Sequence, residues 1–252
     1  MPKIIAGKTE IECRLIIFDR NGTLVDQQHF LLNLAKARFQ SLSKIVGVHV
    51  AELWEKAVGT DLKHGYVDHN GPLATAPQRE EVLVAVSVIY QCGRSWSEAK
   101  KMVQEAYDQA DESLKPTYGC VLFEGVSDVL RKLKSNSLKL AIATTDSHKR
   151  TEESLKSLEV AQFFDAVIGA DDVENPKPAP DLVLEACKQT GCKPSDAVVI
   201  GDSLSDMIMS KNAKVGKCIA VLTGFTPKEE LQRVANVVIN SVTELKARVV
   251  WR

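Results

Sequence analysis

Short apolar runs alternate with amphipathic segments over the second half of the chain. Each run is only a few residues long and is bounded by Gly, Asp or Thr, which is typical of buried parallel strands. The segments between the runs have helical spacing, so we expect an α/β fold with a parallel sheet and helices on both faces. The predicted strands are Leu140–Ala143, Ala166–Gly169, Ala197–Ile200, Cys218–Leu222 and Val237–Ile239, and the predicted helices are Lys149–Leu158, Asp181–Thr190, Ser205–Asn212 and Lys228–Val234.

One further apolar run, Leu15–Phe18, lies far upstream and predicts another strand of the same sheet. The region that follows it lacks strand-like patterning, and its His-, Gly- and Pro-rich stretch Lys63–Pro77 is expected to be a loop. We therefore predict a Rossmann-like core of residues 1–26 and 118–252, with residues 27–117 inserted as a helical domain. The helices expected in the insert are Phe30–Leu42, Val50–Ala57, Glu80–Gln91 and Ser97–Ser113.

Composition narrows the classes of protein that this chain can represent. It has 252 residues, with 32 Lys and Arg against 33 Asp and Glu, for a formal net charge of −1. This balance disfavours a nucleic-acid partner, since such proteins carry a basic excess. No apolar run approaches the roughly 20 residues that span a bilayer, and the first residues lack a signal-peptide core. The six cysteines are scattered, so we expect reduced thiols and a cytoplasmic protein without a membrane partner.

Polar residues follow four of the predicted strands, at the edge where ligands bind in a doubly wound sheet. They are Asp19 and Asn21 after the first strand, Thr144 and Thr145 after the second, Lys177 after the third, and Asp202 and Asp206 after the fourth. Carboxylate oxygens suit a hard cation such as Mg²⁺. A lysine and hydroxyl groups bind phosphoryl oxygens, and a carboxylate can attack phosphorus. The set predicts a Mg²⁺-dependent reaction on a phosphate, with Thr144, Thr145 and Lys177 binding the phosphate.

These residues stand in an order that resembles a known family. Residues 15–26 resemble the first motif of the haloacid dehalogenase superfamily, D-x-D-G-T-L-x-D. Thr144 resembles its second motif, Lys177 its third, and residues 201–206 its fourth, G-D-x-x-x-D. The helical insert between the first two motifs is similar to the capped, phosphoglycolate phosphatase-like branch.

The resemblance implies a role for each matching position. Asp19 is expected to be the nucleophile and a magnesium ligand, and Thr144 to bind the transferring phosphate. Lys177 neutralises that phosphate and orients Asp19. Asp202 is expected to bind the metal, and Asp206 to contact it directly or to support its ligands. The implied reaction is hydrolysis of a small phosphorylated metabolite, phosphoglycolate-like in class, through an aspartyl-phosphate.

Asn21 is where the chain departs from the family pattern. The family has an Asp at this position that acts as general acid and then as general base, and an amide cannot transfer a proton at neutral pH. The family's metal ligand here is the backbone carbonyl, which Asn21 retains. We therefore expect magnesium and phosphate binding to persist and turnover to fall by up to about 10²–10⁴-fold. The residue is compatible with a slow or specialised phosphohydrolase, an engineered variant of a phosphatase, or a phosphate-ligand binder.

Two alternative functions stay open at this point. Phosphonoacetaldehyde hydrolases also lack the second Asp of the first motif and use a cap lysine as a Schiff base, a role that Lys63 would take here. A non-catalytic protein that binds a phosphate ligand would keep Asp19, Lys177 and Asp202 without turnover. A dehalogenase is less favoured, because its chemistry needs no metal and the chain retains Asp202 and Asp206.

Overall fold

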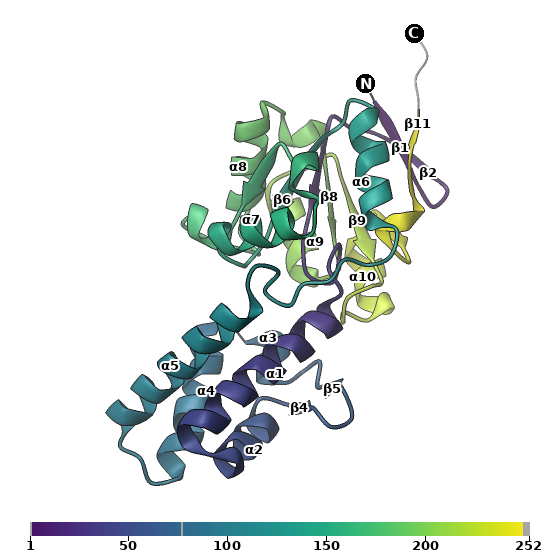
Figure 1. The fold of residues 1–252 in the computed structure, drawn as a ribbon. Helices are drawn as coiled ribbons and strands as arrows, with labels where there is room; N and C mark the ends of the chain where they lie inside the picture. The colour runs from purple at the N-terminus through teal and green to yellow at the C-terminus, as the bar shows by residue number, and fades with distance from the viewer. Residues whose placement is uncertain (1, 77, 249–252) are drawn as a thin grey trace. The chain divides into compact units, whose positions relative to one another are not determined.

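The computed structural model describes residues 2–76 and 78–248, and the chain divides into two compact units. An α/β unit comprises Met1–Gln27 and Cys120–Arg252, and a helical unit comprises Gln28–Gly119 (Figure 1). Over the described residues, no helix combines the length and apolar character that crossing a bilayer requires. Each unit is built around its own set of packed elements.

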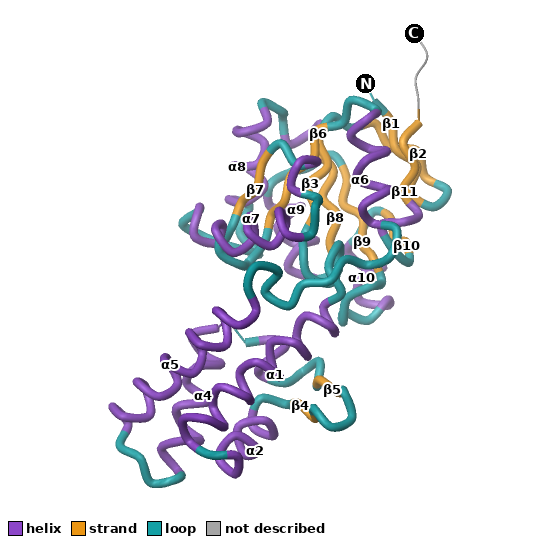
Figure 2. The backbone as a smooth tube through the Cα atoms, in the orientation of Figure 1, coloured by secondary structure: helices purple, strands orange, loops and turns teal. Residues whose placement is uncertain are grey.

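A six-stranded parallel sheet forms the centre of the α/β unit, in the order β10–β9–β8–β3–β6–β7 (Figure 2). Strand β3 lies in the middle and pairs with β6 on one side and β8 on the other. The parallel sheet predicted from the apolar runs is confirmed. The strands are β3 (Leu15–Phe18), β6 (Lys139–Ala143), β7 (Ala166–Ile168), β8 (Ala197–Gly201), β9 (Lys217–Val221) and β10 (Val237–Ile239).

Helices cover both faces of this sheet because successive side chains of each strand point to opposite faces. Ile16 and Phe18 belong to one core cluster, with residues of α6 and α7. Leu15 and Ile17 belong to another, with residues of α8 and α9. The α/β fold with helices on both faces is thereby confirmed. The helices are α6 (Val126–Ser135), α7 (His148–Ser157), α8 (Asp181–Thr190), α9 (Leu204–Asn212) and α10 (Lys228–Val234).

A second, antiparallel sheet in the order β11–β1–β2 joins the two ends of the α/β unit. Its strands are β1 (Lys3–Ala6), β2 (Thr9–Glu12) and β11 (Leu245–Arg248). Ile4 of β1 and Leu245 of β11 are buried in the same cluster as Ile16, so this sheet extends the core. Four short 3₁₀ helices among the described residues complete the unit: η1 (Ala161–Phe163), η2 (Ala170–Asp172), η3 (Pro194–Asp196) and η4 (Val242–Glu244).

The chain leaves the α/β unit and re-enters it along two adjacent extended segments. The amide of Asp26 donates to the carbonyl of Val121 (2.8 Å), and the amide of Phe123 donates to the carbonyl of Leu24 (3.0 Å). Both segments are fixed by the α/β unit itself, so the insertion starts and ends at neighbouring points.

The helical unit contains the four helices predicted for the insert. They are α1 (Gln27–Val46), α2 (Val48–Ala57), α4 (Gln78–Gln91) and α5 (Trp96–Leu114). The loop predicted over Lys63–Pro77 is wrong in its described part. That part contains β5 (Tyr66–Val67), paired with β4 (Thr60–Asp61), and α3 (Pro72–Thr75), whereas residue 77 lies outside the described residues. Pro72 starts α3 because its fixed φ and missing N–H suit the first position of a helix.

A buried polar network holds the four main helices of this unit together. Arg38 of α1 pairs with Glu81 of α4 (2.7 Å), and the Tyr107 hydroxyl of α5 donates to the same carboxylate (2.5 Å). Trp54 of α2 donates its indole N–H to the Tyr107 oxygen (3.0 Å). Burial, together with the charge of Glu81, raises the pKa of Tyr107 well above its usual range, so its hydroxyl remains a donor.

Candidate active site

Asp19 follows β3 directly and meets a lysine from a distant part of the chain. Lys177 lies in the loop between η2 and α8, and its Nζ is 2.5 Å from Asp19 Oδ1 and 2.6 Å from Asp206 Oδ1. The lysine side chain is only 3% exposed. One buried ammonium therefore joins two carboxylates that are 187 positions apart in sequence, between β3 and α9 (206 − 19).

Asp202 and Asp206 follow β8, and hydrogen bonds from two different segments hold their carboxylates. The Thr23 hydroxyl donates to Asp202 Oδ1 (3.0 Å). Asp206 forms a capping box with Ser203, in which the Ser203 amide donates to Asp206 Oδ2 (3.1 Å) and Ser203 Oγ accepts from the Asp206 amide (3.2 Å). Each carboxylate therefore accepts a hydrogen bond from the protein itself, Asp202 from Thr23 and Asp206 from Ser203.

The cluster of Asp19, Asp202 and Asp206 fits a divalent cation. Oxygen atoms of all three carboxylates lie within 4.8 Å of one another. With Lys177 the fully ionised cluster carries two more negative than positive charges, which one divalent ion would balance. Oxygen donors of this kind are the ligands that Mg²⁺ prefers. The acidic cluster could thus bind the metal that the sequence predicts.

Glycines keep space around Asp202. At Gly22, where φ is +83°, a Cβ atom would lie 2.5 Å from Asp202 Oδ2. A Cβ atom at Gly224 would also overlap the Asp202 side chain. Thr223 donates its hydroxyl to the Gly22 carbonyl (2.5 Å) and so ties the segment after β9 to the first motif. The sequence interpretation missed Thr223 and Gly224, although their place directly after a predicted strand was a usable signal.

Burial sets the electrostatics of the cluster. Burial raises the pKa of Asp19, with Lys177 opposing the rise and Asp206 adding to it. Burial and the charges of Asp19 and Asp206 raise the pKa of Asp202 well above its usual range. Burial opposes the charge on Lys177, but Asp19 and Asp206 outweigh it and raise the pKa of the lysine. The ammonium therefore stays charged, while full ionisation of the carboxylates is costly without a cation.

Thr144 lies at the same edge of the sheet as Asp19, because β6 pairs with β3 with Ile142 beside Phe18. Thr144 is buried, and its Oγ1 accepts from the Asp146 amide (3.2 Å). Thr145 is exposed. The structure thus places a buried hydroxyl where the second motif was predicted, and leaves its neighbour at the surface.

Asn21 is partly exposed, and its side-chain oxygen accepts a hydrogen bond from Arg20 Nε (3.1 Å). Arg20 is fully buried. The sequence interpretation did not single out Arg20, although a charged residue inside an otherwise apolar and turn-forming motif was a visible signal.

Lys63 belongs to the helical unit and lies in the turn between β4 and β5. Its side chain is exposed within that unit. The next residue, His64, contacts Asp61 through its ring (2.6 Å). The burial that would activate a Schiff-base lysine is not supplied by the described residues of the helical unit.

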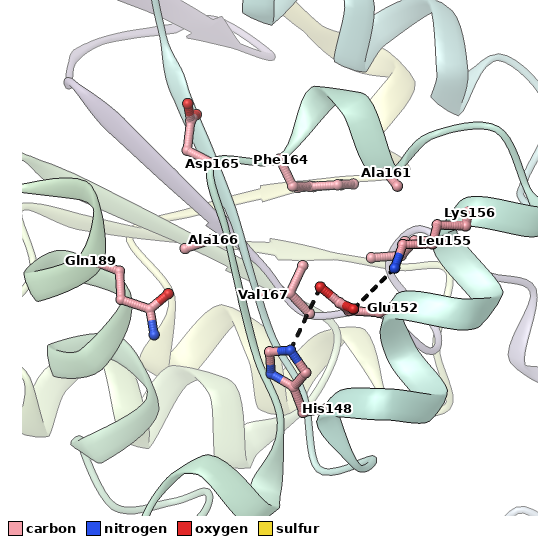
Figure 3. Close-up of a pocket in the computed structure, with 10 residues that line it drawn as sticks. All are labelled: His148, Glu152, Leu155, Lys156, Ala161, Phe164, Asp165, Ala166, Val167 and Gln189. Atoms are coloured by element: carbon pink, nitrogen blue, oxygen red, sulfur yellow. Dashed lines mark hydrogen bonds and ion pairs between the residues drawn. The ribbon is translucent and has the colours of Figure 1, made fainter.

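A separate cavity of about 320 Å³ lies beside α7 and β7 (Figure 3). It is lined by His148, Glu152 and Lys156 of α7, by Asp165, by Gln189 of α8, and by several apolar residues. The charged groups of α7 pair with one another, with His148 3.6 Å and Lys156 3.1 Å from Glu152, and Asp165 pairs with Lys134 (2.6 Å). The four charged residues of the carboxylate cluster do not line this cavity. This cavity is therefore distinct from the carboxylate cluster beyond β3 and β8.

The fold and the cluster together define a hydrolase class with a doubly wound sheet and buried carboxylates beyond its strand ends. The family model for haloacid dehalogenase-like hydrolases matches residues 16–221. The chain belongs to the haloacid dehalogenase-like hydrolase family. The resemblance noted in the four motifs is thereby confirmed.

Individual relatives cover different shares of the chain. A pyrophosphatase PpaX from Bacillus velezensis is 38% identical over 91 residues, which is 36% of this chain and 42% of that protein. The chain thus matches less than half the length of this relative. Phosphoglycolate phosphatase 1 of Pseudomonas aeruginosa is 25% identical over 217 residues, 84% of this chain and 70% of that protein. The structure of a subfamily IA hydrolase from Geobacter sulfurreducens has a TM-score of 0.62 at 21% identity, covering 92% of this chain and 94% of that chain, and shows the shared fold.

Proposed function

We propose that the chain hydrolyses a small phosphomonoester, phosphoglycolate-like in class, through an aspartyl-phosphate on Asp19. The observation that carries this proposal is the contact of Lys177 with both Asp19 and Asp206, with Asp202 in the same cluster. The similarity to a phosphoglycolate phosphatase over 84% of the chain supports the substrate class. The pyrophosphatase similarity covers 36% of the chain and supports cleavage of phosphoryl bonds in general.

In the first step a carboxylate oxygen of Asp19 attacks phosphorus. The bond between phosphorus and the leaving-group oxygen breaks, and that oxygen takes the bonding electron pair and a proton from water, which gives the alcohol. Lys177 holds the attacking carboxylate in place and offsets charge on the phosphoryl oxygens, and Thr144 and Thr145 donate hydroxyl hydrogen bonds. In the second step water attacks the same phosphorus and gives up a proton to solvent, the bond to Asp19 breaks with its electron pair returning to the carboxylate, and inorganic phosphate leaves.

Asp19, Asp202 and Asp206, with the backbone carbonyl of Asn21, would hold Mg²⁺. When bound, this ion stabilises the charge that develops on the phosphoryl group. The cap domain and the substrate class follow from the family resemblance, and the location and the excluded partners follow from the composition and charge balance. Residues 27–117 act as a cap domain that determines specificity, the partner is a small phosphorylated metabolite, and the protein works in the cytoplasm without a nucleic-acid or membrane partner.

Asn21 makes both steps slow in different ways. Its amide has no proton to give to the leaving oxygen, so that oxygen takes a proton from water. The same amide cannot accept the proton of the attacking water in the second step. A substrate with a good leaving group needs little protonation, so its first step is fast and its second step limits turnover. The aspartyl-phosphate should then accumulate.

A pre-steady-state assay with 4-nitrophenyl phosphate and Mg²⁺ tests this proposal. The expected result is a burst of about one nitrophenol per site, followed by slow turnover, and an acid-stable, base-labile phosphoenzyme. Asp19→Asn should abolish the burst and the phosphoenzyme. Asp128→Asn, an equivalent change on the exposed surface of α6, should leave both unchanged. Equal bursts for the wild type and Asp19→Asn would overturn the assignment of the nucleophile.

Asn21 also favours a second candidate, a phosphate-ligand binding protein that has lost turnover. This alternative predicts Mg²⁺-dependent binding of inorganic phosphate, with neither burst nor phosphoenzyme. A third candidate is a phosphonoacetaldehyde hydrolase that uses Lys63. In that case borohydride should trap the substrate covalently on Lys63. Calorimetry with phosphate and a borohydride trapping assay separate these outcomes from hydrolysis.

A further inference from the structure

Arg20 carries a buried charge and directly follows Asp19, the proposed nucleophile. It is fully buried and is among the largest side chains of the chain that have no exposure. Burying a guanidinium is costly unless its N–H groups find partners. The position therefore needs a reason beyond packing, because an apolar residue of similar volume would avoid that cost.

Two partners fix the end of the Arg20 side chain. Nη2 donates to Asp146 Oδ2 (2.6 Å), and Nη1 donates to the Ser154 hydroxyl (3.1 Å). Asp146 follows β6 and Ser154 lies in α7, so the guanidinium is held from two elements. Arg150 lies 3.6 Å from the same oxygen of Asp146, which places that carboxylate between two guanidinium groups. A planar group held at two nitrogens has a fixed orientation.

The third nitrogen of Arg20 fixes the side chain of Asn21. Nε donates to Asn21 Oδ1 at 3.1 Å. A guanidinium has donors and no acceptor, so the carboxamide must turn its oxygen, and not its NH₂ group, toward Arg20. The two ends of a carboxamide are rigidly linked through Cγ. Fixing Oδ1 therefore also fixes the direction of the Nδ2 donors.

We propose that Arg20 is a positioning residue, which holds Asn21 so that Nδ2 donates a hydrogen bond to the leaving-group oxygen of the substrate. This rests on the proposed function, because it assumes phosphoryl transfer to Asp19. In this arrangement Asn21 stabilises the negative charge on the departing oxygen without transferring a proton. Arg20 itself touches neither substrate nor phosphorus and acts through Asn21.

The size of the effect depends on the leaving group. Removing one fixed donor to a developing oxyanion costs about 10²–10³-fold in rate in well-studied enzymes. We expect about 10²-fold for an alkyl phosphate, whose departing oxygen carries much charge. For 4-nitrophenyl phosphate we expect less than about tenfold, because the ring delocalises that charge. A merely structural defect would reduce both rates alike.

A double-mutant cycle on both substrates tests the proposal. Asn21→Ala removes the donor, and Arg20→Lys keeps a cation beside Asp146 but removes the Nε–H. Each single variant should slow kcat for the alkyl phosphate more than it slows the burst rate for the aryl phosphate, since the burst reports the first step of aryl phosphate turnover. The double variant should be within about twofold of Asn21→Ala, because Arg20 acts through that residue. Arg131→Lys on the exposed face of α6 is the matched control and should behave as wild type.

Two kinds of result would contradict the positioning role of Arg20. If the effects of Arg20→Lys and Asn21→Ala multiply, or if Arg20→Lys slows both substrates equally, the positioning role is overturned while Asp19-dependent turnover stands. If Asp19→Asn is as active as wild type, the proposed function fails and this inference fails with it. If Arg20→Lys does not fold, ¹⁵N relaxation of the Asn21 side-chain amide in the wild-type protein tests whether Arg20 holds that amide rigidly. A rigid amide, with an order parameter near 0.85, supports the proposal, and one below about 0.6 overturns it.

Discussion

The charge balance of the carboxylate cluster can be tested by replacing Asp202 with Asn. The substitution keeps the shape of the side chain and an oxygen that accepts from the Thr23 hydroxyl. It removes one negative charge from a buried group of three. We expect opposite effects with and without metal: Asp202→Asn should be more stable than wild type in EDTA and less stable than wild type in saturating Mg²⁺.

The magnitude follows from the geometry of the cluster. Carboxylate oxygens within 4.8 Å of one another repel by about 3.5 kcal/mol per pair at an effective dielectric constant of about 20. Asp202 faces two such charges, and Lys177 offsets part of the repulsion. A net gain of about 1–3 kcal/mol is therefore expected for metal-free Asp202→Asn, roughly 2–12 °C in Tm. Mg²⁺ at 100 times its Kd should stabilise wild type by about 2.7 kcal/mol and the variant far less.

The sign of the pH dependence of folding stability follows from the raised pKa values of the cluster. Burial and neighbouring charges raise the pKa of Asp202 in the folded protein, and burial raises that of Asp19. Between the ordinary carboxyl pKa and the raised one, the folded state binds more protons than the unfolded state. The metal-free protein should therefore lose stability as pH rises through that window, with the full loss present above it. Removing the charge at position 202 should make this loss smaller.

Thermal unfolding by calorimetry in EDTA and in Mg²⁺, at pH 5 and pH 8, provides the measurement. Asp128→Asn, at an exposed site, is the control for a generic loss of charge. Equal stabilisation of wild type and Asp202→Asn by Mg²⁺ would refute the metal assignment. A metal-free Asp202→Asn protein that is less stable than wild type at pH 8 would refute the electrostatic argument.

Three further predictions follow. Lys177→Met should abolish turnover and destabilise the folded protein by about 3–5 kcal/mol, because buried carboxylates lose their partner; kinetics and urea unfolding measure both. Asn21→Asp should raise kcat for an alkyl phosphate. The gain should lie at the low end of about 10²–10⁴-fold, because Arg20 favours the ionised form of the new carboxylate. No gain would mean that position 21 is misassigned. Glu81→Gln should destabilise the chain by about 3 kcal/mol by leaving a buried guanidinium without its counter-charge, whereas exposed Glu80→Gln should change its urea midpoint little.

The central sheet was predictable because its strands are buried on both faces. A strand such as β8 has no solvent-facing positions and so appears in the sequence as an unbroken apolar run. The helices α8 and α10 have the predicted bounds to the residue. Their ends coincide with local signals, such as Gly191 in the left-handed conformation at the end of α8.

The sheet of β1, β2 and β11 was not predictable in the same way. Its strands are four residues long, and β2 and β11 carry charged side chains at alternate positions, whereas β1 carries only Lys3. Strand β1 pairs with β11 so that Lys3 lies beside Arg248, a contact across almost the whole chain. Local patterning contains no information on such a pairing. The hairpin of β4 and β5 was missed for a related reason, since strands of two residues have no periodicity.

At the site, the charged positions were predictable and their supports were not. Asp19 and Asp202 directly follow β3 and β8, so topology alone brings them to one edge of the sheet, whereas Lys177 reaches that edge from the loop between η2 and α8. Arg20 was not predicted because its importance depends on where Asp146 and Ser154 are placed by other elements. The catalytic roles of these residues stay predictions.

The paired segments around Asp26 and Val121 have a consequence for protein engineering. The segments that flank the insertion are hydrogen-bonded to each other within the α/β unit. Residues 28–119 can therefore be treated as a module that is removed between two fixed, neighbouring points. Replacing them with a tight turn leaves the path of the remaining backbone continuous. The same pair of segments offers a splice point at which another inserted domain could replace residues 28–119 without redesigning the strands of the α/β unit.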